Sequence, residues 1–242
     1  MAQRNREAIE SKLSYPEFLA LLITDEGARS DQKKYTHHLS KAGFKGDKTL
    51  AGVDFDFNLG IDQRQVSDLA DRRFIEEKVA VLIAGPCGTG NSHIAQALSR
   101  CAVRKRYEVL FTTQSQLGGQ IHAARATGTI GSKLQPQTRV PLLMIDDFGL
   151  KLIKPVQDGD FHALIAERYE SVSTIVTSNL DFNEWGEALP NKLLSASTLD
   201  RLRHGSHQLV LDGKSYRSPW PLKQEQDHQF QRSPKPRNNR SA

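Results

Sequence analysis

A short glycine-rich segment carries backbone amides and one hydroxyl at the spacing that phosphate binding requires. The apolar run Val81–Ala84 leads into Gly85, Gly90 and Ser92, which fit the phosphate-loop pattern between a strand and a helix. Glycines allow successive N–H groups to point at phosphate oxygens, and the helix that follows adds the positive end of its dipole. The candidate nucleotide contacts are Gly85, Pro86, Cys87, Gly88, Thr89, Gly90, Asn91, Ser92 and His93.

One position departs from that pattern. Asn91 stands where the pattern has a lysine, whose charge reaches the β- and γ-phosphates. An asparagine offers an amide N–H on a shorter side chain and brings no charge. Two unit charges ~4 Å apart at an effective dielectric constant of 20 interact by ~4 kcal/mol. Because much of this interaction counts in the transition state, we expect weaker nucleotide binding and a larger loss of hydrolysis.

Two carboxylates follow a later apolar run. Leu142–Ile145 leads directly into Asp146 and Asp147. Asp146 is the candidate that would organise Mg²⁺ together with the Ser92 hydroxyl, and Asp147 is the candidate that would orient or activate an attacking water. The alternative is an ordinary strand-to-turn transition, where aspartate is common. Their position downstream of the phosphate loop, with another strand between, favours the functional interpretation.

Further polar residues could complete a hydrolytic site. Asn179 follows a β-branched run and could hydrogen-bond the γ-phosphate or the water, although asparagine is also common in turns. Arg201 and Arg203 precede the last apolar run, where an arginine can reach a nucleotide in a neighbouring subunit. Arg201 is the first candidate and Arg203 the second, with a solvated helix face as the alternative. Arg217 is a further candidate for contact with the nucleotide or the neighbour.

Alternating strands and helices must hold these residues in place. The apolar runs are nearly continuous, as expected for strands covered on both faces. Strand–helix alternation implies a parallel sheet with right-handed crossovers, and therefore an α/β fold. The predicted strands are Val79–Ala84, Val109–Thr112, Leu142–Ile145, Thr174–Thr177 and Gln208–Leu211, and the predicted helices are Ser92–Arg106, Ser115–Arg125 and Asp160–Ser171.

Three regions are predicted along the chain. Residues 1–48 form a helical appendage that begins a helix at Ser14–Glu17 and ends it at glycines, residues 49–217 form the nucleotide-binding domain, and residues 218–242 form a disordered basic tail. The net charge is +5, and the two ends carry this excess because the middle region is neutral. Basic ends can contact the phosphate backbone of DNA, and solvated termini that bind nothing are the alternative.

Membrane and secretory settings are not expected. The apolar runs are far shorter than the ~20 residues that a membrane span needs. Charged residues follow Met1 closely, without the apolar stretch of a secretory signal. Cys87 and Cys101 form no metal or disulfide pattern. A cytoplasmic location is therefore expected.

Longer stretches of the chain resemble a known family. Together they are similar to the IstB-like helper ATPases of insertion-sequence transposons, which are related to the DnaC-type helicase loaders within the AAA+ class. The resemblance spans roughly residues 11–217. It rests on LSYPEFLALLITDE, AGFKGDKTLAGVDFDF, GPCGTGNSHIAQAL, LLMIDDFGL, ERYE with STIVTSNLDFNEWGE, and LLSASTLDRLRHGSHQLVLDGKSYR.

The resemblance implies a fold, a cofactor and partners. The fold is a P-loop NTPase of the AAA+ type, with a five-stranded parallel sheet flanked by helices. The cofactors are ATP and Mg²⁺, bound between subunits of a homo-oligomeric ring or filament, and the partners are DNA and a transposase. The positions carried over are Gly85–Ser92, Asp146, Asp147, Asn179 and Arg201. Asn91 and Asp147, which replaces the usual glutamate, are departures from the family.

Four functions remain open at this point. The chain is a working helper ATPase, a nucleotide-binding DNA assembly factor without turnover, an inactive copy from a decayed mobile element, or a helicase-loader-like ATPase of DNA replication. The transposon-type strings favour the first three.

Overall fold

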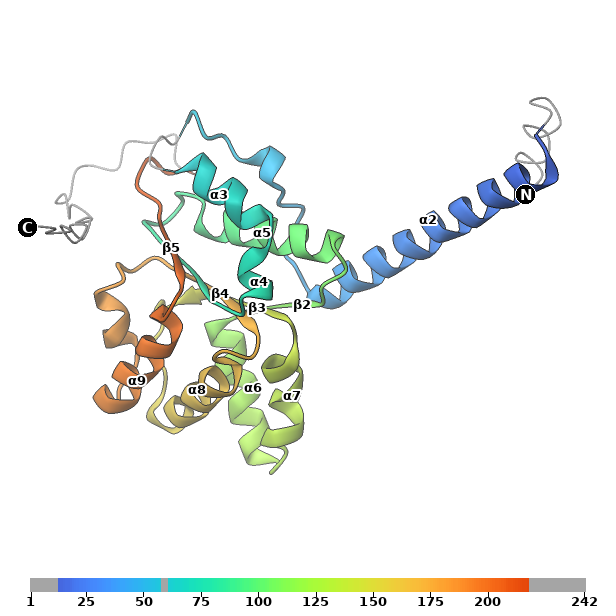
Figure 1. Cartoon of the computed structure of the whole chain (residues 1–242). Coiled ribbons are helices and arrows are strands. Elements are labelled where there is room, and N and C mark those ends of the chain that lie inside the picture. Colours follow the sequence, from blue (N-terminus) through green and yellow to red (C-terminus); the bar gives the residue numbers. More distant parts are fainter. Residues whose placement is uncertain (1–12, 58–60, 218–242) are drawn as a thin grey trace, which may run out of the picture.

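Five parallel strands lie at the centre of the molecule, in the order β2-β3-β4-β1-β5 (Figure 1). The computed structural model describes residues 13–57 and 61–217. The prediction of a five-stranded parallel sheet flanked by helices is confirmed. The strands are β1 (Val81–Ala84), β2 (Val109–Thr113), β3 (Leu142–Phe148), β4 (Ser173–Ser178) and β5 (His207–Val210).

Helices cover both faces of the sheet, as near-continuous apolar strands require. Successive side chains of a strand point to opposite faces, so Val81 and Ile83 pack into one core cluster and Leu82 into the other. One face carries α3 (Gln63–Ala70), α4 (Arg73–Glu76) and α5 (Asn91–Arg104), and the other carries α6 (Gln114–Ala126), α7 (Ile130–Arg139), α8 (Pro155–Arg168) and α9 (Lys192–Arg203) (Figure 1).

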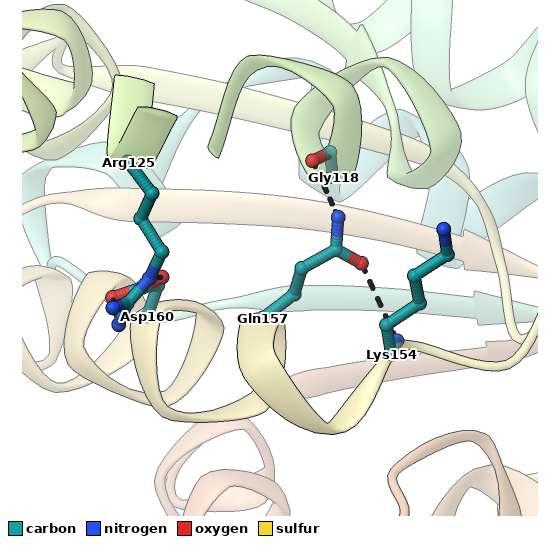
Figure 2. Close-up of polar contacts among 5 residues, drawn as sticks. All are labelled: Gly118, Arg125, Lys154, Gln157 and Asp160. Carbon is teal, nitrogen blue, oxygen red and sulfur yellow. Dashed lines mark hydrogen bonds and ion pairs between the residues drawn. The ribbon is translucent and has the colours of Figure 1, made fainter. Parts of the chain in front are cut away.

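Helix α8 begins earlier than predicted, at Pro155 and not at Asp160. Proline is favoured in the first turn, where its missing N–H needs no acceptor. Gln157 fixes this turn, because its Oε1 accepts from the Lys154 amide at 3.3 Å and its Nε2 donates to the Gly118 carbonyl of α6 at 2.6 Å. Figure 2 shows this link beside the ion pair between Arg125 and Asp160.

Several elements were not predicted from the sequence. Helix α7 contains Pro136, which argues against a helix locally, yet the helix packs against α6 and α8. Helix α3 is short and begins at an Asp62 cap whose carboxylate accepts from the Arg64 and Gln65 amides. The remaining unpredicted elements are α4, α9 and the 3₁₀ turns η1 (Leu50–Gly52) and η2 (Glu184–Ala188).

The N-terminal helix α2 (Tyr15–Ala42) projects from the sheet and its layers (Figure 1). It starts where predicted, because Ser14 and Glu17 form a capping box, and it ends at Gly43 in a left-handed conformation. Its C-terminal end packs on the core through Tyr35, Leu39 and Ala42.

Two earlier predictions concern parts of the chain that the structure leaves out. The tail at 218–242 and the first residues of the appendage lie outside the described residues. Within the described part of the chain, no helix has both the length and the apolar composition needed to cross a membrane.

Candidate nucleotide site

A cavity of about 490 Å³ lies where β1 and β4 end and α5 begins. Ligands of open parallel sheets bind at this carboxyl edge. Most of the predicted site residues line this cavity. Residues that precede the sheet and residues that follow β5 complete the lining. The lining residues are Lys48, Gly52, Val53, Ile61, Cys87, Gly88, Gly90, Asn91, Ser92, His93, Ile94, Asp147, Leu150, Asn179, Tyr216 and Arg217.

The phosphate loop needs glycine at its two ends. A Cβ on Gly85 would lie 2.3 Å from the Leu211 carbonyl oxygen, so the loop starts where two backbones touch. Gly90 has a φ of 113° and caps the N-terminus of α5. The first amides of a helix have no acceptor within that helix, and Asn91, Ser92 and His93 line the cavity. This end of α5 is therefore suited to phosphate oxygens.

Ser92 and Asp146 meet across the sheet edge. The Ser92 Oγ donates to the Asp146 Oδ1 at 2.7 Å, and the Thr177 hydroxyl donates to the same oxygen. Asp146 is buried, with 6% of its surface exposed. Hydroxyl and carboxylate oxygens are the ligands that Mg²⁺ prefers, so Ser92 and Asp146 fit a magnesium ion that neutralises phosphate charge when bound.

A β-bulge turns Asp147 towards the cavity. Ile145 pairs with Val176 and Phe148 pairs with Ser178, so two residues of β3 oppose the single residue Thr177 of β4. Strict alternation would place Asp147 on the same face as Ile145, away from α5. Instead Asp147 adopts a φ of 59°, its amide donates to the Thr177 Oγ1 at 3.3 Å, and it lines the cavity.

The two carboxylates share one electrostatic environment. Burial and the neighbouring charge of Asp146 raise the pKa of Asp147, whereas Lys45, Arg217 and Lys48 act in the opposite direction. A raised pKa makes a carboxylate a better proton acceptor at neutral pH as long as it stays ionised. This arrangement suits the water-activating role predicted for Asp147.

The side-chain amide of Asn91 forms hydrogen bonds within the protein. Its side chain is buried, and its Nδ2 donates to the Gly85 carbonyl at 2.5 Å and to the Ser178 carbonyl at 3.1 Å. The Asn91 Oδ1 accepts from the Thr89 hydroxyl at 3.3 Å. The same Nδ2 also lies 3.5 Å from the Asn179 Oδ1, so the amide's N–H donors face oxygens of the protein. Asn91 therefore ties the phosphate loop to the end of β4, and its amide donors are engaged by oxygens of the protein.

The remaining predicted residues divide between the cavity and another surface. Asn179 lines the cavity, and its Oδ1 lies 3.5 Å from the Asn91 Nδ2. Arg201 donates to the Ser197 carbonyl at 3.0 Å within α9 and lines a separate depression. Arg203 donates to the Phe182 carbonyl. The structure thus brings Asn179 to the phosphate loop of its own chain but does not bring Arg201 or Arg203 there.

Three residues of the site were missed in the sequence. Thr177 lies in a strand rich in β-branched residues, where a threonine is typical of the strand and does not indicate a site. Tyr216 donates from its hydroxyl to the Asp54 carbonyl at 2.5 Å and packs on Phe57 with ring centres 4.6 Å apart. Lys48 lines the cavity from the segment before the sheet. It falls within the string AGFKGDKTLAGVDFDF, but the resemblance gives it no role in the site.

Comparisons with known proteins point to one family. The family described as IstB-like ATP binding protein matches residues 1–224. The protein named "Insertion sequence IS21 putative ATP-binding protein" from Pseudomonas aeruginosa is 34% identical over 211 residues, which cover 87% of this chain and 80% of that protein. The corresponding protein of IS5376 from Geobacillus stearothermophilus is 34% identical over 209 residues, with coverage of 85% and 82%.

Solved structures share the fold. The crystal structure of DnaI aligns with a TM-score of 0.59 at 22% identity, covering 68% of this chain and 90% of that one. AMPPCP-bound DnaA from Aquifex aeolicus aligns with a TM-score of 0.58 at 18% identity, covering 70% and 51%. The DnaC helicase loader aligns with a TM-score of 0.55 at 19% identity, covering 62% and 87%. At these identities the likeness concerns the fold alone.

Proposed function

This chain belongs to the family of IstB-like ATP binding proteins, and from this premise we propose that it is an ATP-dependent helper of an insertion-sequence transposase that assembles on DNA. One observation carries the proposal. The Ser92 hydroxyl and the Asp146 carboxylate meet at 2.7 Å, at the end of a glycine-rich loop and beside a cavity of about 490 Å³. That geometry supports the binding of a nucleotide's phosphates together with Mg²⁺.

Each residue of the site has a role in this proposal. The loop from Gly85 to Ser92 binds the phosphates through its amides, and Ser92 and Asp146 hold Mg²⁺. Asp147 orients the attacking water and accepts its proton, while Asn179 hydrogen-bonds the terminal phosphate or that water. The bulge in β3 supports this division of roles, because it turns Asp147 towards α5, the face on which regular alternation already places Asp146.

Assembly brings in a second subunit. Arg201 lies outside the cavity of its own chain and is held on α9 by Ser197. We place it against a nucleotide bound in a neighbouring subunit, where an arginine supplies transition-state charge. The basic ends of the chain, with balances of +2 for residues 1–48 and +3 for residues 218–242, suit the DNA backbone.

Turnover is expected to be slow in the natural chain, which favours an assembly factor that holds nucleotide over a fast ATPase. Asn91 supports this expectation, because it brings no charge and its amide hydrogens are directed at protein carbonyls. A transposase is the expected partner, since the curated relatives are proteins of insertion sequences. A replicative helicase as the bound partner would contradict this assignment, and co-purification with each candidate distinguishes the two.

Magnesium-dependent nucleotide binding is the first test of the proposal. Fluorescent ATP is expected to bind saturably, and EDTA or Asp146→Asn is expected to weaken binding about tenfold, because each removes a charge-assisted contact. Titration by fluorescence anisotropy measures the effect. Asp68→Asn, which removes an exposed carboxylate of α3, is the matched control and should bind as the natural chain does. Absence of saturable binding at millimolar nucleotide would contradict the proposal.

Arg201→Ala should separate nucleotide binding from assembly. Because Arg201 lies outside its own cavity, ATP binding by the isolated subunit is expected to stay within about twofold, while ATP-dependent assembly on DNA weakens about tenfold. Anisotropy measures the first quantity and mobility shift of labelled DNA the second. Lys192→Ala, in the first turn of the same helix, is the control. A loss of nucleotide binding equal to the loss of assembly would place Arg201 in its own subunit's site.

A further inference from the structure

One face of α5 contacts residues 46–49, the segment that precedes the sheet. The Thr49 carbonyl lies 2.9 Å from the His93 Nε2. Two turns further along α5, Arg100 donates to the Gly46 carbonyl and forms an ion pair with Asp47 at 3.0 Å. Helical residues three to four apart share a face, so one side of α5 binds residues 46–49 along their length.

Gln96, on the same face, fixes the lysine of this segment. Its side chain is buried, with 1% exposed. With the amide oriented so that each end has a complementary partner, the oxygen accepts from the Lys48 Nζ at 3.1 Å and the nitrogen donates to the Lys45 carbonyl at 3.1 Å. A buried amide with both ends satisfied defines one position for its partner. The Lys48 ammonium is therefore held in place by the same helix that ends the phosphate loop.

The Lys48 side chain lies at the cavity in which the phosphates are proposed to bind. Lys48 is half-buried and lines the cavity together with Ser92 and Asp147. Burial, together with the charges of Arg217 and Lys45, lowers the pKa of Lys48, while the carboxylates of Asp146 and Asp147 raise it. An ammonium group that is partly withdrawn from water gains most from an anion that comes close to it.

We propose that Lys48 supplies, from outside the phosphate loop, the positive charge for the nucleotide's phosphates that the loop lacks at Asn91. The inference rests on the proposed function, because it assigns a further contact in the same site. Lys48 approaches from the face of α5 that carries Ser92 and Gln96. Lys48 therefore lies on the side of Ser92 and Asp146, which would hold Mg²⁺, whereas Asn91 contacts the Ser178 carbonyl of β4.

Arg217 is the other cation that lines the cavity, and the structure favours Lys48 over it. The Arg217 side chain is exposed, and its backbone amide donates to the Ser215 hydroxyl at 3.2 Å. Lys48, in contrast, is anchored by the buried Gln96 in a segment that α5 holds at both ends. A side chain that is already ordered loses less conformational entropy when it binds a ligand.

Substitution of Lys48 tests the inference through binding. Lys48→Met is expected to weaken the binding of fluorescent ATP with Mg²⁺ about tenfold, since a charge-assisted phosphate contact is lost. Lys48→Arg retains the charge and is expected to stay within about threefold of the natural chain. Lys105→Met, which removes one charge just beyond the far end of α5, is the matched control and should change nothing. The dependence of binding on salt should weaken for Lys48→Met but not for Lys105→Met.

A double-mutant cycle with Asn91→Lys sharpens the test. If both positions serve the same phosphates, Lys48→Met should cost less than about threefold in the Asn91→Lys background, because that variant supplies a charge from the loop. Equal losses in both backgrounds would overturn the shared role. Equal binding by the natural chain and Lys48→Met, or a loss confined to Arg217→Gln, would overturn the inference and leave the proposed function standing. Failure of the natural chain to bind nucleotide would overturn both.

Discussion

Asn91→Lys is expected to raise the rate of ATP hydrolysis by about 30-fold over that of the natural chain. A charge near 4 Å at an effective dielectric constant of 20 contributes up to about 4 kcal/mol, and half of that, about 2 kcal/mol in the transition state, corresponds to roughly 30-fold in rate. A lysine side chain is longer than that of Asn91, whose amide contacts the Gly85 and Ser178 carbonyls. Phosphate release under saturating ATP and Mg²⁺ measures the rate.

A neutral variant separates charge from side-chain length. Asn91→Gln lengthens the side chain without adding charge and is expected to leave hydrolysis at the level of the natural chain. Combining Asn91→Lys with Asp147→Asn should return the rate close to that level, because the water-activating carboxylate is then missing. Hydrolysis by the natural chain as fast as by Asn91→Lys would show that the asparagine does not limit turnover.

Arg168→Met is expected to lower the free energy of unfolding by about 3 kcal/mol or more. Arg168 ends α8 with 1% of its surface exposed. Its guanidinium donates to the Gln137 carbonyl at 2.6 Å, to the Val140 carbonyl at 3.0 Å and to the Ser173 carbonyl, and it donates to the Thr174 hydroxyl at 2.9 Å. Each buried acceptor that is left without a donor costs about 1–3 kcal/mol.

The charge of Arg168 persists at neutral pH. Burial lowers the pKa of Arg168 to about 9, which still leaves the guanidinium protonated at pH 7. It joins the end of α7 and the starts of β3 and β4, so its removal affects three elements at one point. Urea denaturation followed by circular dichroism measures the loss, with the exposed Arg139→Met as control. A loss under about 1 kcal/mol would contradict the account of Arg168 as a structural link.

Much of the fold could be predicted from local patterns. The strands are short apolar runs, and the order of strand, glycine-rich loop and helix from Val81 to Ser92 is a local signal. The helix start at Ser14 and its end at Gly43 also follow from residues that act on their own turns. Helix α7 escaped prediction, because Pro136 argues against a helix locally while packing against α6 and α8 decides for one.

Such local patterns predicted less of the candidate site. The sequence by itself determined the phosphate loop, the two aspartates after β3 and the missing lysine at Asn91. Tertiary structure alone decided that a bulge opposite Thr177 turns Asp147 towards the cavity. It also decided that Lys48 reaches the site through Gln96.

The physical reason for this division is the range of the interactions. A cap, a tight turn or an apolar strand depends on neighbours within a few residues, so its signal is present in a short window of sequence. The direction of Asp147 depends on the register of β3 against β4, and the position of Lys48 depends on a buried amide in a helix 48 residues further along the chain. Such relations exist only once distant segments have packed together.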